Sequence, residues 1–416
     1  MKIVVLSVHS FDGIGSLTRI KLIISNLANI YGRENIEWVN LVPFGWRTKG
    51  ILKNRRLYTS DIKYIKYLPW FLFPKLNSLS FWFLKKYIQT WLAWRYSNDG
   101  TLMWLEMSPS YEVFGSYFKN NKKVPLIIDI HGTIDEFLLS PQKDDRLFNN
   151  YSKAVFNEVS GIFRANGIVT VSNKMFQIYK SRYCLKDTIN VTIPTIPDNE
   201  LFEYSLETRL KFRKKLSIEN NFVFVYSGGI SKWQCIEETL LLFDKIRNNQ
   251  QFKALNPILF MLVWDNKFSL KEKLEKLNIF SENIFVYNLK QNEVGDYLQA
   301  CDAGIILRDN LSTNLVASPT KIAEYYSSGL PIITTKFVGD ISEMVKKNEN
   351  LGYIVDLDQY NDINSLLKWC NFVEENKEMI VEECANFVSD YYGVHNYEKL
   401  RTIIDKVLYN NEAKPK

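Results

Sequence analysis

Residues 318–333 read S-P-T-K-I-A-E-Y-Y-S-S-G-L-P-I-I and contain a helix start, a helix end and a following strand. Ser318 is a residue type that caps helices, and Pro319 suits the first helical position, where its missing N–H costs nothing. The glycine and proline at the far end stop the helix, and P-I-I-T-T predicts a buried strand after it. Helices that alternate with buried strands predict a parallel α/β sheet.

The same helix has the properties of a ligand site. Free N–H groups at a helix start favour phosphate, which makes Ser318 and Thr320 candidate ligand-binding residues. Lys321 stands in the first turn, where a cation opposes the helix dipole unless an anion lies nearby. Glu324 is about 9 Å further along the axis, at ~1.5 Å per residue, close to the span from a diphosphate to its ribose. The pattern predicts a nucleotide-sugar site, with an ordinary capped surface helix as the alternative.

The bulk properties restrict the function class. The 416 residues suffice for two domains, and 46% hydrophobic with 24% charged residues is typical of globular proteins. A net charge of +6 is mild for a nucleic-acid binder, so no nucleic-acid partner is expected. Five scattered cysteines without a C-x-x-C pair indicate reduced thiols in a cytosolic protein. No apolar run is long enough for a membrane span, and the first is too short for a signal peptide.

Both halves of the chain alternate short apolar runs with helical patterns. The predicted strands are 3–8, 36–42, 102–105, 125–130, 167–171 and 189–193, then 222–226, 258–263, 284–287, 304–307, 331–335 and 353–355. The double-proline segment I-P-T-I-P-D-N predicts a linker. We therefore expect an N-terminal Rossmann-like domain at 1–198, a C-terminal one at 199–390, and a terminal helix at 391–416.

Ligands of open α/β sheets bind beyond the carboxyl ends of the strands, and glycine-rich loops follow the first strand of each half. In H-S-F-D-G-I-G-S, Gly13 and Gly15 allow close approach of the backbone to a ligand. The third glycine of the dinucleotide fingerprint is absent, which argues against NAD. In Y-S-G-G-I-S-K-W-Q, Gly228 and Gly229 open the turn, and Lys232 either neutralises a pyrophosphate or is a solvated loop lysine.

Two further side chains follow buried strands. Arg308 leaves the strand at 304–307, and its fork of donors suits phosphate. His131, in D-I-H-G-T-I-D-E, either hydrogen-bonds a sugar hydroxyl or phosphate or is an ordinary structural histidine.

Residues 64–96 are rich in aromatic and basic side chains. They include Trp70, Trp82, Lys85 and Lys86. Such a segment suits a bilayer interface that collects a lipid-linked acceptor. The alternative is that the aromatic residues belong to the core of the N-terminal domain, with the lysines facing water.

Together these motifs resemble glycosyltransferase family 4, whose members are retaining enzymes of the GT-B fold with two facing Rossmann-like domains. The resemblance covers nearly the whole chain and rests on the glycine turn after the first strand and the H-G after the fourth. It also rests on I-V-T-V-S-N-K-M, I-P-D-N, Y-S-G-G-I-S-K-W-Q, Y-L-Q-A-C-D-A-G-I-I-L and the S-P-T-K helix. In this fold the C-terminal helices cross back to the N-terminal domain.

One departure concerns the glutamate pair of the family. The family carries two glutamates separated by seven residues, and Glu324 fits the second, which contacts the ribose. Val316 occupies the place of the first. The chain is similar to a subgroup with R-x5-N-x-V-A-S-P-T-K-x-x-E-Y, in which Arg308 and Asn314 would share the lost role. The G-R…K-G pair is also altered, leaving Lys232 as the cation for the phosphates.

The resemblance implies a retaining, metal-independent glycosyltransferase of hexosyltransferase type. It would move a sugar from a nucleotide-sugar donor to a glycan or polyprenyl-linked acceptor in synthesis of surface polysaccharide such as capsule or O-antigen. Lys232, Arg308, Glu324 and His131 are the candidate catalytic residues, and no cofactor or metal is expected. The expected place is the cytoplasm, with peripheral contact to the inner face of the cell membrane left open. The alternatives are a nucleotide-sugar 2-epimerase of the same fold and a non-catalytic nucleotide-sugar-binding partner.

Overall fold

The computed structural model describes residues 1–8, 14–40, 65–67, 78–96, 100–106, 110–139, 145–196, 199–263, 269–357 and 362–412. The chain divides into two compact units. The first contains Met1–Ile193 and His395–Lys416, and the second contains Pro194–Val394. The boundaries expected from the sequence lie at 198/199 and 390/391.

The first unit is built on a seven-stranded sheet with the order β3-β2-β1-β4-β5-β6-β7, and its neighbouring strands are parallel. The strands are β1 (Lys2–Ser7), β2 (Ile36–Asn40), β3 (Ile65–Tyr67), β4 (Thr101–Glu106), β5 (Leu126–Ile130), β6 (Gly167–Thr170) and β7 (Ile189–Thr192). Helices cover both faces of such a sheet, so its central strands are apolar along almost their whole length.

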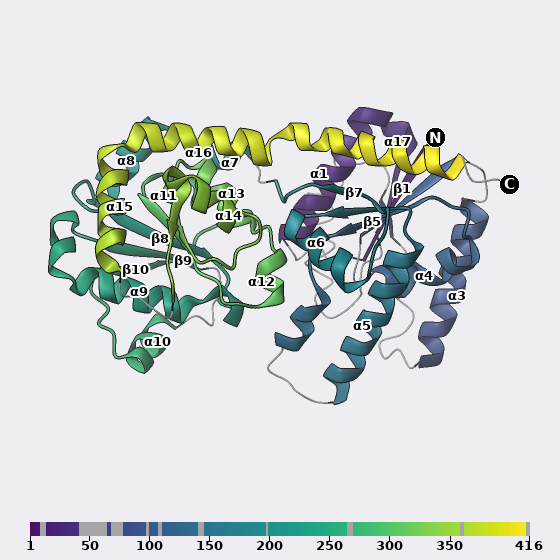
Figure 1. Ribbon diagram of the computed structural model, residues 1–416, viewed down its shortest axis with the longest axis horizontal. Coiled ribbons are helices and arrows are strands. Elements are labelled where there is room, and N and C mark those ends of the chain that lie inside the picture. Colours follow the sequence, from purple (N-terminus) through teal and green to yellow (C-terminus); the bar gives the residue numbers. More distant parts are fainter. Residues whose placement is uncertain are drawn as a thin grey trace. The chain divides into compact units, whose positions relative to one another are not determined.

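Helices lie on both faces of this sheet. They are α1 (Ile14–Tyr31), α3 (Ser78–Arg95), α4 (Ser110–Asn120), α5 (Asp145–Arg164), α6 (Asn173–Arg182) and α17 (Glu398–Glu412), with short 3-10 turns at Arg33–Asn35, Ile134–Leu139 and Val394–Tyr397. Figure 1 shows α3, α4 and α5 on one face, and α1 and α17 on the other. Arg19 of α1 donates to both carboxylate oxygens of Asp129 in β5, at 3.0 and 2.7 Å, and to the Ile193 carbonyl at 2.9 Å.

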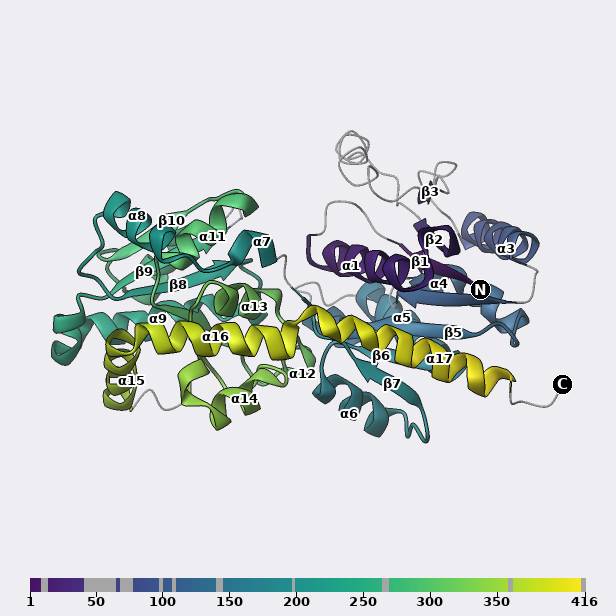
Figure 2. The same cartoon turned by 90° about the horizontal axis from the view of Figure 1, so that it is seen from above.

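The chain returns to the first unit at its C-terminal end, as the fold prediction required. Helix α17 packs on β6 and β7 (Figure 2). Gly167 makes this contact close, because a Cβ there would lie 2.8 Å from Val407 and 3.1 Å from Ile403. A larger residue at this position would push the helix away from the strand.

The second unit has a six-stranded parallel sheet with the order β10-β9-β8-β11-β12-β13. Its strands are β8 (Val223–Gly228), β9 (Ile258–Val263), β10 (Ile284–Tyr287), β11 (Ala303–Ile306), β12 (Ile332–Thr334) and β13 (Gly352–Ile354). Its helices are α7 (Asn199–Phe202), α8 (Leu206–Leu216), α9 (Ile236–Asn248), α10 (Leu270–Leu277), α11 (Gln291–Gln299), α12 (Ser312–Val316), α13 (Thr320–Ser327), α14 (Ile341–Lys347), α15 (Ile363–Glu375) and α16 (Lys377–Tyr392). Short 3-10 turns lie at η3 (Lys232–Gln234), η4 (Gln250–Leu255) and η5 (Glu349–Leu351).

The prediction of two parallel α/β domains is confirmed, and each predicted strand is present. Strand β3 is not among the predicted strands. This three-residue strand lies in the aromatic and basic stretch of residues 64–96. Three residues are too few to show a strand period.

Candidate functional site

Helix α13 begins one residue later than predicted. Pro319 occupies the N-cap position and Thr320 is the first helical residue, with no side-chain cap. The Ser318 hydroxyl instead accepts a hydrogen bond from the Thr195 backbone N–H at 3.3 Å. The prediction that Ser318 caps the helix is therefore wrong, because its oxygen is committed to another segment. No side chain caps the first turn of α13, which leaves it suited to an anion.

Two cations meet beside this helix start. Arg308 follows β11, is 3% exposed, and donates from Nη2 to the Gln234 side-chain oxygen at 2.8 Å. Lys321 donates from Nζ to the same oxygen, also at 2.8 Å. Arg308 is further held by its Nη1 donating to its neighbour's carbonyl, that of Leu307, at 2.7 Å. The loops after β8 and β11 and the start of α13 thus converge at one point.

The two cations lack carboxylate partners. Within the described ranges, neither Arg308 nor Lys321 has a carboxylate oxygen within the 4.0 Å of an ion pair. Burial lowers the pKa of Lys321 well below its ordinary value, and the charge of Arg308 lowers it further. Burial also lowers the pKa of Arg308. Arg308 is buried and Lys321 is half-buried, and two cations that share one neutral acceptor make this cluster suited to an anion.

The glycines after β8 have different roles. Gly228 has φ +133°, and a Cβ on it would lie 2.5 Å from Lys321 Nζ. Only glycine therefore allows the lysine to lie here, 4.8 Å from the centroid of the Tyr226 ring. A Cβ added to Gly229 would have no neighbouring atom within 4 Å, so the space beside this residue is open.

Glu324 lies on the same helix as Lys321 and is half-buried. Burial raises the pKa of its carboxyl group to about 7, and the charge of Lys321 opposes this rise. A carboxyl group that is costly to ionise is suited to accept hydrogen bonds from the hydroxyls of a bound ligand.

The other predicted donor residues lie in the same unit with different surroundings. Lys232, the first residue of η3, is exposed. Asn314 is buried, and its side-chain amide donates to the carboxylate and carbonyl oxygens of Asp309 at 2.6 and 3.2 Å. Val316 is buried at 3% exposure, so the position at which the resemblance would place a first glutamate is packed.

In the first unit, His131 follows β5 and lies beside the buried carboxylate that ends β4. Its Nε2 is 3.2 Å from Glu106 Oε1, and its buried Nδ1 has no hydrogen-bond partner. Both residues stand at carboxyl ends of neighbouring strands, where ligands of such sheets bind. Gly15 lies in α1, whereas Gly13 lies outside the described residues.

The aromatic segment around α3 combines a buried and an exposed face. Ile88 and Leu92 are buried, whereas Phe83, Tyr87 and Trp94 are exposed, together with Lys86. Trp82 and Lys85 belong to α3 but their side chains lie outside the described set, and Trp70 lies outside the described residues. None of the helices described is long and apolar enough to cross a membrane.

Sequence reasoning missed Gln234 and Glu106. Gln234 ends the Y-S-G-G-I-S-K-W-Q loop, but an uncharged residue two places after Lys232 carries no electrostatic signal. Glu106 directly follows the apolar run of β4, and an acid at the carboxyl end of a buried strand could have identified it.

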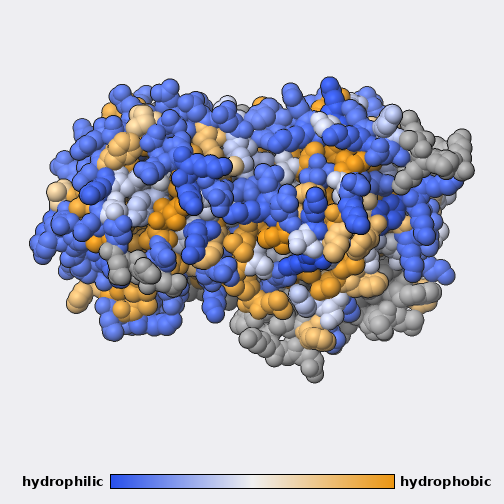
Figure 3. Space-filling model, viewed as in Figure 1, coloured by the Kyte–Doolittle hydropathy of each residue, from blue (hydrophilic) through white to orange (hydrophobic). Residues whose placement is uncertain are grey.

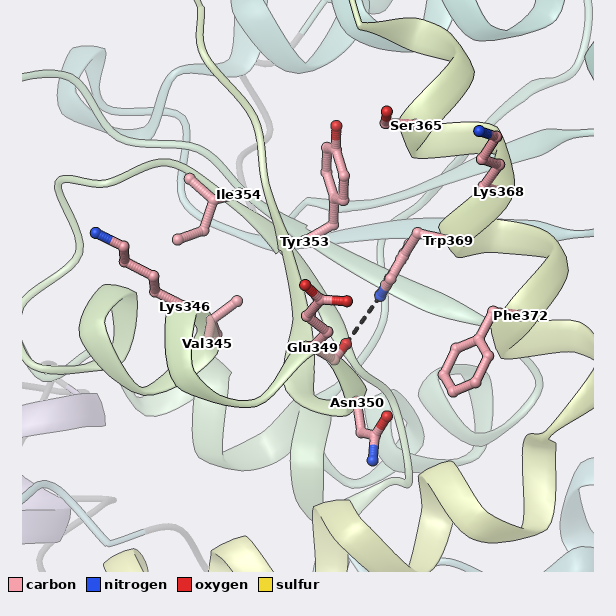
Figure 4. A pocket seen from close by; sticks show the side chains of 11 residues that line it. Val345, Lys346, Glu349, Asn350, Tyr353, Ile354, Ser365, Lys368, Trp369 and Phe372 are labelled. Atoms are coloured by element: carbon pink, nitrogen blue, oxygen red, sulfur yellow. Dashed lines mark hydrogen bonds between the residues drawn. The ribbon is translucent and has the colours of Figure 1, made fainter.

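A separate hollow of about 550 Å³ lies along the edge strand β13. It is lined by α14, η5, β13 and α15, and the Trp369 Nε1–H donates to the Glu349 carbonyl at 3.0 Å within it (Figure 4). None of the predicted site residues lines it. The charged cluster at Gln234 is therefore the better candidate, because convergent polar groups distinguish a functional site from a surface hollow.

Residues 208–387, within the second unit, match the model of the family described as glycosyl transferases group 1. The matched residues include Gln234, Arg308 and Lys321. Over 163 residues the chain is 26% identical to chitobiosyldiphosphodolichol beta-mannosyltransferase of Debaryomyces hansenii. That match covers 38% of this chain and 34% of the Debaryomyces protein.

Solved structures extend the likeness to both units. HepE of Anabaena in complex with UDP has a TM-score of 0.69 at 15% identity, covering 97% of this chain and 100% of that one. WaaG, a glycosyltransferase involved in lipopolysaccharide biosynthesis, has a TM-score of 0.64 at 14% identity, covering 97% and 99%. The predicted GT-B fold is thereby confirmed.

Proposed function

We propose that this chain is a glycosyltransferase whose nucleotide-sugar donor places its diphosphate against Arg308 and Lys321. The observation that carries the proposal is a buried arginine and a half-buried lysine, held by one neutral oxygen, at the carboxyl end of the sheet in the part of the chain that matches the group 1 model. HepE, a structural neighbour, binds UDP and UDP-glucose, which supports a donor of this chemical class.

In the proposed reaction the bond between the sugar anomeric carbon and the β-phosphate oxygen breaks, and a bond from the acceptor oxygen to that carbon forms. The acceptor proton passes to the departing phosphate oxygen, so atoms and charge balance. Lys232, Arg308, Lys321 and the free N–H groups of α13 stabilise the negative charge of the leaving diphosphate. Glu324 accepts hydrogen bonds from the ribose.

The stereochemistry and metal requirement are also part of the proposal. Transfer on the face of the departing phosphate retains the anomeric configuration, in line with the resemblance to family 4. Because the cations and the helix start neutralise the diphosphate, no divalent metal is required.

The decisive experiment incubates the purified chain with UDP-, GDP-, CDP- and ADP-sugars and an acceptor panel. Stabilisation by one donor in a thermal-shift assay identifies the base, and product analysis by NMR identifies the reaction and anomer. Formation of a new glycosidic bond supports the proposal. An epimerised donor would indicate the 2-epimerase, binding without turnover would indicate the non-catalytic partner, and an inverted anomer would overturn retention.

For the acceptor we propose a polyprenyl-linked saccharide collected at the surface of an anionic membrane, in surface polysaccharide synthesis. Two helices of the first unit support this. Helix α3 carries three basic residues and no acidic ones, and exposes Trp94 at 74%. Helix α5 exposes Phe148, Phe156 and Phe163, and Figure 3 shows hydrophobic surface where α5 lies in Figure 1. Aromatic side chains beside cations suit the interface of an anionic bilayer.

Sedimentation with vesicles of anionic and neutral lipid tests the membrane contact. We expect binding to the anionic vesicles that weakens at least tenfold in Lys85→Glu/Lys86→Glu. The control is Lys271→Glu/Lys276→Glu, in the second unit, which introduces the same charge change on another surface. Equal binding by the α3 variant and the parent protein would overturn the contact.

A further inference from the structure

The turn that carries Gln234 is rigidly built. Gln234 is the last residue of η3, and its backbone N–H donates to the Ser231 carbonyl at 2.8 Å. Cys235, directly after it, has φ 51°, a left-handed conformation that residues with a side chain rarely adopt. The next residue, Ile236, begins α9. A backbone held in this conformation by a helix on one side and a hydrogen-bonded turn on the other fixes where the Gln234 side chain points.

The side chain of Gln234 satisfies two cations without neutralising either. Its Oε1 accepts from Arg308 Nη2 and from Lys321 Nζ, each at 2.8 Å. A carbonyl oxygen has two lone pairs, so both of its acceptor positions are used. The amide carries no charge, so it adds no negative charge to the cluster.

We propose that Gln234 is a positioning residue for donor binding, which rests on the proposed function. It holds Arg308 and Lys321 in their binding geometry before the donor arrives and leaves their charge to the diphosphate. A glutamate has nearly the same shape but would supply the counterion itself. It would then pair with both cations in the free protein and repel the incoming phosphates.

The test compares Gln234→Glu with the parent chain in two measurements. The first is the thermal unfolding temperature without ligand, and the second is the affinity for UDP, GDP, ADP and CDP by calorimetry. We expect Gln234→Glu to raise the unfolding temperature and to weaken the preferred nucleoside diphosphate at least tenfold. The matched control is Gln251→Glu, which adds the same charge at an exposed position of the same unit and should leave both values unchanged.

A second variant separates positioning from a general structural role. Gln234→Met keeps the length of the side chain but offers no oxygen to the cations. We expect it to lower the unfolding temperature while weakening the nucleotide less than Gln234→Glu does, because it adds no negative charge. A purely structural glutamine would instead lose stability in both variants.

The outcomes distinguish this inference from the proposed function. If the parent chain binds one nucleoside diphosphate and Gln234→Glu binds it equally well, the role of Gln234 is refuted alone. The same holds if Gln234→Glu loses both stability and affinity. If the parent chain binds none of the four nucleotides, the proposed function and this inference are refuted together.

Discussion

Replacing Glu324 with glutamine should stabilise the ligand-free protein at alkaline pH while impairing transfer. The carboxyl group titrates near 4.5 in an unfolded chain, and burial raises its pKa to about 7 in the fold. Between these values the folded protein retains a proton that the unfolded chain has released. The contribution of Glu324 to the free energy of unfolding therefore falls as the pH rises through this range, and it is smallest above pH 7.

The magnitude follows from the two pKa values. A difference of about 2.5 corresponds to about 3 kcal/mol, which is an upper limit because Glu324 is only half-buried. Glutamine does not titrate, so Glu324→Gln should be more stable than the parent chain by up to that amount at pH 8. The advantage should disappear near pH 4.5. Transfer should fall at least tenfold, or about 1.4 kcal/mol in the barrier.

The assay is urea unfolding followed by fluorescence at pH 5, 6, 7 and 8, using the transition that a bound nucleotide stabilises, since this transition reports the second unit. Glu219→Gln, which removes an exposed carboxylate from the same unit, is the control and should track the parent chain. Parallel pH profiles for Glu324→Gln and the parent chain would refute the argument that burial holds this carboxyl protonated.

Three further predictions concern other residues. Gly228→Ala should weaken nucleotide binding at least tenfold in calorimetry, because the new Cβ would lie 2.5 Å from Lys321 Nζ at a positive φ. Gly229→Ala, where the Cβ meets open space, should bind like the parent chain, and equal losses in both variants would contradict this. Lys232→Ala should reduce transfer at least tenfold in a steady-state assay. Because the side chain is exposed, the free energy of unfolding should change by less than about 0.5 kcal/mol. Near-parental turnover would remove Lys232 from the site. Asp129→Asn should destabilise the first unit by about 3–5 kcal/mol in denaturant unfolding, because it leaves Arg19 buried without its counterion. A loss below about 1 kcal/mol would show that the ion pair contributes little to stability.

The fold and part of the site could be predicted from the sequence, and the reasons are local. In β8 residues 223–226 are apolar and are followed by Ser227 and Gly228, and β9 is apolar along its whole length, so these strands can be predicted from composition alone. Lys321 was identified because a cation in a first helical turn conflicts with the helix dipole. Such conflicts within a short segment are visible without coordinates.

The misplaced and missed residues depend on contacts between distant segments. Ser318 has the right chemistry for a cap, yet Thr195, which is 123 residues earlier in the chain, uses its hydroxyl oxygen. Gln234 matters only because β11 and α13 bring Arg308 and Lys321 to its side-chain oxygen. No pattern within a single stretch of sequence encodes such a three-way contact.

The absence of a glutamate at position 316 is consistent with this local structure. Position 316 is occupied by Val316, which is buried. Gln234 accepts a hydrogen bond from Arg308, and Asp309 accepts one from Asn314. The Gly339 backbone N–H further fixes the loop by donating to the Asn314 carbonyl at 3.2 Å. A loop anchored at these points sets the distance between the two cations at its ends before any ligand binds. In the proposed reaction, cations that are held in place before the donor binds would lower the cost of stabilising the charge of the leaving diphosphate.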